Sequence, residues 1–238
     1  MSTEKIKVAV MQPYFLPYIG YFQLINSVEK FVFFDDVNFK VRGWINRNRI
    51  LINGEPFLFS IPLKRKSQNK IINQIKIADE LNWRDRFLKS VELSYKKAPF
   101  FNETFEIVAK VAEFDTSNLA YFIMNSIFVV NEHLKIKTAL IPSSSIYKNK
   151  ELKGEQRVLD ICKKESAEIY INPYFGINLY NKEHFSSEGI KILFQRTKAI
   201  QYDQFKHDYI NNLSIIDILM FNPKEQVKEY LDHYEVVE

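Results

Sequence analysis

The stretch IKVAVMQPYFLPYIGYFQLINSVEKFVFFDD (residues 6–36) decides the fold, because it contains a strand, a loop, a helix and a second strand in that order. Residues 6–11 are a short apolar run with β-branched side chains, which is typical of a buried strand. Pro13 and Pro17 each remove a backbone donor and restrict the residue before them, so residues 12–18 are expected to be a loop. A helix to about Ser27 and a strand at residues 31–34 follow. This order predicts the start of a parallel, wound α/β sheet.

Downstream of this opening, the pattern first predicts strands and then helices. Asn53-Gly54 between two apolar runs predicts a β-hairpin, and residues 72–77 favour a further strand. Apolar side chains then recur at helical spacing. Asp115-Thr116-Ser117-Asn118 supply capping oxygens ahead of one helix, and Ser214 is the expected cap of a later one. The other predicted elements are a helix at 155–164, strands at 138–142, 168–172 and 190–195, a helix at 215–221, and a final helix from Pro223 to about Tyr234.

These elements predict an α/β fold with a mostly parallel, Rossmann-like wound sheet in one domain, residues 1–238. Within it, residues 38–78 form a strand-rich insertion with a β-hairpin, and residues 83–134 form a helical segment. The length of 238 residues, with 46% hydrophobic and 15% aromatic residues, is typical of one globular domain and excludes a disordered chain.

Composition also limits compartment and partners. The single cysteine, Cys162, permits no internal disulfide and favours a reducing compartment. The N-terminal residues lack the apolar core of a signal peptide, and the most apolar stretch is too short to cross a bilayer, so we expect a cytoplasmic protein without a membrane span. The net charge of +4 (33 − 29) is mild, which favours a small anionic ligand over nucleic acid.

The loop after the first strand is the first candidate site. Ligands of wound sheets collect beyond the carboxyl ends of strands, where we expect Gln12, Tyr14, Tyr18 and Tyr21. Residues 15–21 resemble a degenerate nucleotidylyltransferase signature, in which two histidines bind phosphates. Tyrosines replace both histidines here and carry no positive charge. The likeness therefore suggests a nucleotidylyltransferase-like fold, while nucleotidyl transfer itself is in doubt. The alternative is an aromatic loop that packs on the sheet.

Asp35 and Asp36 follow the second strand directly and are the candidate catalytic residues. Adjacent side chains of an extended chain point in opposite directions, so one of the two is expected to face the crevice. That carboxylate could act as a general base, hold a substrate amine, or bind Mg²⁺. The alternative roles are helix capping and a salt bridge with an arginine.

Three further groups are candidate substrate contacts. The first group is a cluster of cations with an interleaved aromatic residue, which suits a diphosphate and a stacked ring: Lys40, Arg42, Trp44, Arg47, Asn48 and Arg49. The alternative is a solvated hairpin strand, which would show the same alternation of charges. Lys153 and Arg157 at a helix start form a second candidate anion site. Asn172 and Tyr180 follow a strand and are candidate sugar contacts, with simple turn roles as the alternative. The histidines lack metal-ligand spacing, so we expect no zinc site.

Several blocks together resemble the WbqC-like family. They cover nearly the whole chain: residues 12–25, 34–37, 42–50, 170–173 with Gly176 and Leu179-Tyr180, and 213–219. The resemblance implies a place in O-antigen and related surface-polysaccharide biosynthesis, and transfer of glycine to an amino sugar. It assigns no catalytic residues.

The resulting function hypothesis is a transferase that attaches a small acyl or aminoacyl group, such as glycyl, to a nucleotide-linked amino sugar. Two alternatives stay open: a nucleotidylyltransferase- or glycosyltransferase-like enzyme, and a non-catalytic nucleotide-sugar-binding protein of the assembly pathway. The cofactor stays open among ATP, another activated acyl donor and Mg²⁺.

Overall fold

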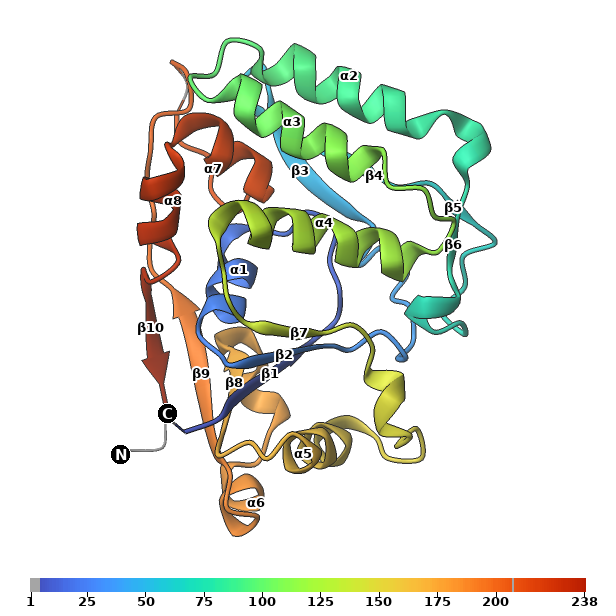
Figure 1. Cartoon of the computed structure of the whole chain (residues 1–238), viewed down its shortest axis with the longest axis vertical. Helices are drawn as coiled ribbons and strands as arrows, with labels where there is room; N and C mark the ends of the chain where they lie inside the picture. Colours follow the sequence, from blue (N-terminus) through green and yellow to red (C-terminus); the bar gives the residue numbers. More distant parts are fainter. Residues whose placement is uncertain (1–4, 207) are drawn as a thin grey trace.

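A six-stranded sheet forms the centre of the computed structural model, which describes residues 5–206 and 208–238 (Figure 1). Its strands are β1 (Lys7–Met11), β2 (Lys30–Phe33), β7 (Ala139–Ile141), β8 (Ile169–Pro173), β9 (Lys191–Thr197) and β10 (Tyr234–Val237). They lie in the order β10-β9-β8-β1-β2-β7, with β10 antiparallel to β9 and every other pair parallel. The predicted α/β fold with a mostly parallel, wound sheet is confirmed.

Helices cover the sheet and extend beyond it. The α-helices are α1 (Ile19–Asn26), α2 (Trp83–Tyr95), α3 (Phe101–Ala112), α4 (Leu119–Leu134), α5 (Gly154–Lys164), α6 (Lys182–Ser187), α7 (Ile215–Phe221) and α8 (Lys224–Tyr230). Short 3₁₀ helices are η1 (Ile72–Gln74), η2 (Asp79–Leu81), η3 (Ser144–Tyr147) and η4 (Tyr174–Leu179). Of the four capping candidates at residues 115–118, Asn118 is the cap, because its side chain accepts the Tyr121 N–H (3.1 Å). The predicted cap at Ser214 is confirmed, because Ser214 accepts the Ile216 N–H (3.3 Å).

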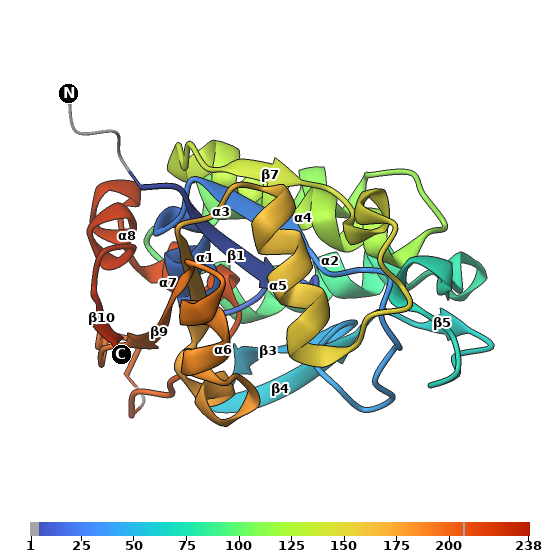
Figure 2. The ribbon, with the colours of Figure 1, turned by 90° about the horizontal axis from the view of Figure 1, so that it is seen from below.

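The alternation of side chains along β1 creates two cores. Val8 and Val10 face α5 and α6, whereas Ala9 lies in the larger core with α1 and α4. Figures 1 and 2 show α5 and α6 on the face of the sheet opposite to α1 and α4. A strand that is covered on both faces is apolar along its whole length, and this explains the nearly continuous apolar run at residues 6–11.

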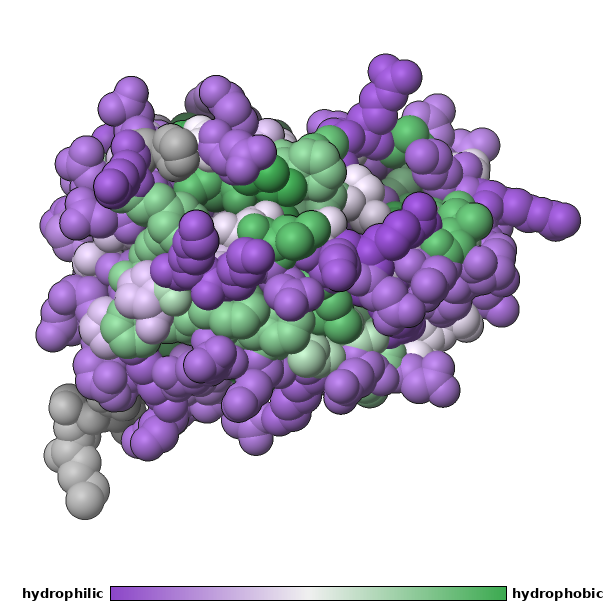
Figure 3. All heavy atoms as spheres, turned by 90° about the horizontal axis from the view of Figure 1, so that it is seen from above, coloured by the Kyte–Doolittle hydropathy of each residue, from purple (hydrophilic) through white to green (hydrophobic). Residues whose placement is uncertain are grey.

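The insertion contains the predicted hairpin, formed by β3 (Arg47–Ile52) and β4 (Glu55–Ser60). Asn53 and Gly54 both have positive φ, at 52° and 81°, as the expected tight turn requires. A smaller pair, β5 (Leu63–Lys64) and β6 (Lys76–Ile77), closes the insertion. The helical segment is confirmed as α2, α3 and α4. Seen from the α2 side of the molecule, the surface carries apolar patches between hydrophilic side chains (Figure 3).

Two expectations about elements were wrong. Residues 72–77 form η1 and the two-residue β6 rather than one strand, because Ile72 and Ile75 are both buried at the three-residue spacing of a 3₁₀ turn. The final helix ends at Tyr230 rather than near Tyr234, and Tyr234 begins β10, which pairs with β9. That pairing joins segments distant in sequence, so local periodicity could not reveal it.

Candidate functional site

The sheet has its topological switch point between β1 and β8. The chain leaves β1 toward β2 through α1, and leaves β8 toward β9 through α6 on the opposite face. In open wound sheets, ligands bind in the crevice that these diverging connections leave at the carboxyl ends of the strands. A cavity of about 410 Å³ lies there, which we call the first hollow; it is lined by Tyr14, Pro17, Tyr18, Trp44, Asn48, Arg49, Phe175 and Asn212.

The first hollow combines exposed aromatic rings with guanidinium groups. Trp44 and Phe175 are 47% and 71% exposed. The guanidinium carbons of Arg47 and Arg49 lie 5.6 Å and 5.5 Å from the centre of the Trp44 ring. The Nε of Arg47 and that of Arg49 are buried and have no hydrogen-bond partner among residues 5–206 and 208–238. These cations therefore keep unused donors beside a stacking surface.

The β1 loop that forms one wall is held from two distant segments. Leu16 has a positive φ of 41°, which is unfavourable for a leucine. Its carbonyl accepts hydrogen bonds from Asn48 Nδ2 (2.6 Å) and Ser214 Oγ (2.8 Å). The predicted contact residue Asn48 thus lines the hollow, but its buried amide positions the loop. The unusual backbone is paid for by bonds that reach across the fold.

The tyrosines of this loop take different places. Tyr14 and Tyr18 line the first hollow, whereas Tyr21 is buried and donates to the Gln12 carbonyl (2.9 Å). Burial raises the pKa of all three phenols, so they are neutral hydrogen-bonding groups at physiological pH. A Cβ at Gly20 would lie 2.4 Å from the Tyr18 ring, so glycine is required for this close approach.

The acidic pair lies beyond β2 and lines neither this hollow nor the second one described below. Asp36 accepts two hydrogen bonds of 2.6 Å from the Arg157 guanidinium, and both side chains are buried. Asp35 accepts from Ser143 Oγ (2.8 Å) and the Ser144 N–H (3.1 Å), and it has no cation partner among the described residues. Burial raises the pKa of Asp35, against the lowering effect of these hydrogen bonds.

The remaining predicted contacts do not gather in the first hollow. Lys40 and Lys153 are exposed, while Arg42 supplies the carbonyl that accepts from Arg47. Asn172 is buried, accepts from Tyr170 Oη (3.1 Å) and donates to the Pro173 carbonyl (3.0 Å). Tyr180 Oη lies 3.1 Å from Tyr170 Oη. A Cβ at Gly176 would collide with the Asn172 amide, so this group shapes the turn that carries Phe175.

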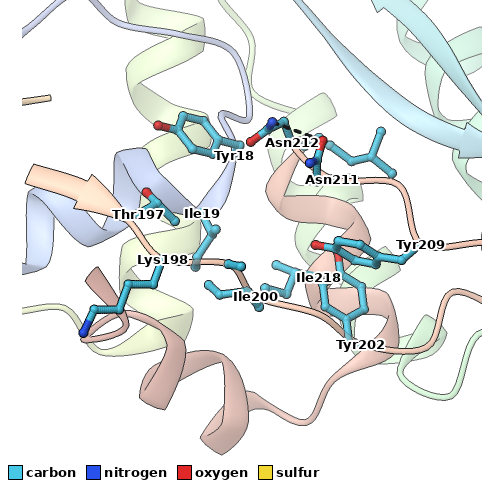
Figure 4. Close-up of a pocket in the computed structure, with 13 residues that line it drawn as sticks. Tyr18, Ile19, Thr197, Lys198, Ile200, Tyr202, Tyr209, Asn211, Asn212 and Ile218 are labelled. Carbon is cyan, nitrogen blue, oxygen red and sulfur yellow. Dashed lines mark hydrogen bonds between the residues drawn. The ribbon is translucent and has the colours of Figure 1, made fainter. Parts of the chain in front are cut away.

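Sequence reasoning missed a second hollow of about 350 Å³, which lies beside the first and shares Tyr18 and Asn212 with it (Figure 4). Thr197, at the end of β9, contributes to its lining, but most of the lining comes from the segment between β9 and α7: Lys198, Ala199, Ile200, Tyr202, Tyr209, Asn211, Asn212, Leu213 and Ser214. This segment has no helical or strand period. Its only signal was a run of tyrosines and asparagines in an otherwise featureless connection.

Comparison with known proteins identifies the family. The sequence model of the WbqC-like protein family matches residues 12–229, and the chain belongs to this family. The chain is also similar to a Mycobacterium tuberculosis protein, "Uncharacterized protein Rv1507c", with 26% identity over 227 residues. The aligned region covers 94% of this chain and 97% of that protein. No solved structure matches the chain.

Two negative observations concern only the described part of the chain. Residues 5–206 and 208–238 contain no group of three or more His, Cys, Asp or Glu side chains placed to hold a metal ion. None of the helices in these residues is both long and apolar enough to cross a membrane.

Proposed function

We propose that the first hollow binds a nucleotide-linked amino sugar, and that the protein is an enzyme of bacterial surface-polysaccharide (O-antigen) biosynthesis. The reaction in this proposal is transfer of a small acyl or aminoacyl group, such as glycyl, to the sugar amine. Membership of the WbqC-like family supports the setting. The observation that carries the proposal is an aromatic cavity lined by Arg49, with Arg47 against the same Trp44 ring, at the switch point of a wound sheet.

The lining of the first hollow matches the parts of a nucleotide. Trp44 and Phe175 offer apolar rings to a base, and such stacking is worth roughly 1–3 kcal/mol per base. Arg47 and Arg49 flank Trp44 and offer forked donors to phosphate oxygens. Arg49 lines the hollow and offers its guanidinium group to a diphosphate, while Arg47 lies on the same Trp44 ring without lining the cavity. Arg42 is exposed and does not line the hollow, and its backbone carbonyl accepts from Arg47.

For the chemical step, the proposal favours Asp35 over Asp36 as general base. A sugar amine is protonated at neutral pH, so acyl transfer requires a group that removes a proton and orients the nitrogen. Asp36 is neutralised by Arg157 and also accepts from Ser144 Oγ. Asp35 has only neutral hydrogen-bond partners among the described residues, and burial raises its pKa. It is 1% exposed and lines neither hollow, so this role requires the chain to move and bring the sugar amine to Asp35.

A second candidate function is a non-catalytic nucleotide-sugar-binding protein. It is favoured because both carboxylates of the acidic pair are engaged in hydrogen bonds and neither lines the first hollow. A protein that only binds its ligand needs no carboxylate in the hollow. Nucleotidyl transfer is less well supported. The tyrosine that replaces the second histidine of that signature, Tyr21, is 3% exposed and donates to a backbone carbonyl.

Binding is tested by thermal shift and tryptophan fluorescence with UDP, dTDP and GDP and their amino-hexose conjugates. Trp44 and Trp83 are the two tryptophans, and only Trp44 lies in the hollow, so ligand quenching should disappear in Trp44→Phe. Arg49→Gln should weaken binding about ten- to a hundredfold, because a charge-assisted hydrogen bond is lost. Arg86→Gln, on the exposed surface of α2, is the matched control. Unchanged affinity in Arg42→Gln, Arg47→Gln and Arg49→Gln would exclude the proposed phosphate site.

Catalysis is tested separately, by mass spectrometry of reactions with amino-sugar nucleotides and candidate acyl donors. Asp35→Asn should abolish product formation while nucleotide-sugar binding is retained. Product formation at the wild-type rate in both Asp35→Asn and Asp36→Asn would rule out the base assignment. Binding without turnover for every donor would favour the non-catalytic function, and turnover that stops on chelation would indicate a metal role for the carboxylate.

A further inference from the structure

The second hollow differs from the first in its chemistry. Its described lining residues include hydroxyl and amide side chains and apolar side chains, one cation, and no carboxylate. Figure 4 shows Tyr209, Asn211 and Asn212 bordering the open space, while the Lys198 side chain extends away from the other labelled residues. The cavity thus offers neutral hydrogen-bonding groups next to aromatic rings, without the paired arginines of the first hollow.

The segment that forms this hollow is anchored to a buried carboxylate. Asp217 is 0% exposed and accepts hydrogen bonds from Tyr95 Oη (2.7 Å), Tyr202 Oη (2.8 Å) and Gln204 Nε2 (2.6 Å). Gln204 also accepts the Ile210 N–H (2.7 Å) and donates to the Ile210 carbonyl (3.0 Å). These bonds fix the described part of the connection, residues 198–206 and 208–214, in which there is no helix or strand. The hollow is therefore formed before any ligand binds, which lowers the entropic cost of binding.

The two hollows are joined rather than separate. Tyr18 and Asn212 line both, and Asn212 also accepts from Arg49 (3.3 Å), one of the two arginines beside Trp44. Asn212 Nδ2 donates to Asn211 Oδ1 (3.2 Å), so a continuous row of polar groups leads from the arginines into the second hollow. A ligand whose phosphates lie at Arg49 would place its next group at Asn211 and Asn212.

We propose that the second hollow is the sugar subsite of the site described above. It binds a hexose through the sugar hydroxyls and the C–H face of the ring, and it disfavours a sugar acid. This inference rests on the nucleotide-sugar binding in the proposed function and not on Asp35 as the base, because Asp35 does not line the second hollow. Sugar hydroxyls pair with neutral hydroxyl and amide groups, and the C–H face of a sugar packs on an aromatic ring such as Tyr209 or Tyr18. A second nucleotide would require cations or a stacking surface like Trp44, and a sugar acid would require a cation directed into the hollow.

The test compares a free nucleoside diphosphate with its hexose conjugate by calorimetric titration, using UDP, dTDP and GDP and their conjugates. The variants are Tyr209→Phe and Asn211→Ala, and Tyr121→Phe on the exposed face of α4 is the matched control. Each variant of the hollow should weaken the conjugate about three- to tenfold, the effect of one lost hydrogen bond. The affinity for the free diphosphate should stay within about twofold of the wild type.

The outcomes separate this inference from the function on which it rests. If both hollow variants leave the conjugate unaffected, or weaken the conjugate and the free diphosphate equally, the sugar subsite is refuted. The proposed function survives that result when Arg49→Gln still weakens both ligands. If none of these probes binds the wild-type protein, both proposals fail together.

Discussion

Replacing Arg157 with methionine should strongly destabilise the fold, because it leaves the Asp36 carboxylate buried without its counter-ion. The Arg157 side chain is 6% exposed and that of Asp36 is 0% exposed, and two bonds of 2.6 Å join them. Arg157 also donates to Asn149 Oδ1 (2.9 Å) and covers the Phe34 ring at 4.9 Å. Ser144 Oγ then remains as the main hydrogen-bond partner of Asp36.

Breaking a buried ion pair from one side costs about 3–5 kcal/mol, a large part of the roughly 5–15 kcal/mol by which domains are stable. For a chain of this length, each kcal/mol lowers the melting temperature by about 2–4 °C, so the expected decrease is roughly 6–20 °C. The measurement is thermal unfolding followed by circular dichroism, with the midpoint in urea as a second probe. Removing both charges, in Asp36→Leu with Arg157→Met, should recover much of the loss, because no charge is then left unpaired.

Lys110→Met is the matched control, since Lys110 pairs with Glu132 on the exposed surface at 2.8 Å, and the melting temperature should move by no more than about 2 °C. The reasoning is refuted if Arg157→Met melts within about 2 °C of the wild type. In that case Arg157 would be available for the anion-binding role that its place at the start of α5 also permits.

Three other changes have definite expected outcomes. Tyr95→Phe should cost about 1–3 kcal/mol in urea unfolding, because it leaves the buried Leu51 N–H without an acceptor and removes a donor to Asp217; an unchanged midpoint contradicts this. Gly20→Ala should weaken nucleotide binding and lower the melting temperature, because its Cβ displaces Tyr18 or Thr197, and wild-type binding would show that α1 can shift. Burial raises the pKa of Asp217, so its protonation stabilises the fold below pH 3.8 and this contribution is lost as the pH rises through the folded-state pKa. The melting temperature of the wild type minus that of Asp217→Asn should therefore fall as the pH rises from 3.8 through the folded-state pKa, and a rise would contradict the sign.

Local patterns predicted most of the elements. The apolar run at residues 6–11, the Asn53-Gly54 turn and the caps at Asn118 and Ser214 each act within a few residues of their own position, so their effects are readable in the sequence. Local patterns also predicted part of the crevice at the carboxyl ends of the strands. The loop after β1 and the Trp44–Arg49 stretch were predicted contacts, and Tyr14, Tyr18, Trp44, Asn48 and Arg49 do line one hollow.

The sequence by itself determined the parallel wound sheet, the hairpin and the placing of an aromatic and cationic loop at the strand ends, because these depend on short-range periodicity and turn chemistry. Only the tertiary structure decided that Asp36 faces Arg157, 121 residues away, and that Ser214 holds Leu16, 198 residues away. It also formed the second hollow from a connection without any period. Such partners are chosen by how buried polar groups find each other in the packed fold, and a buried charge or carbonyl accepts whichever distant group the topology brings to it.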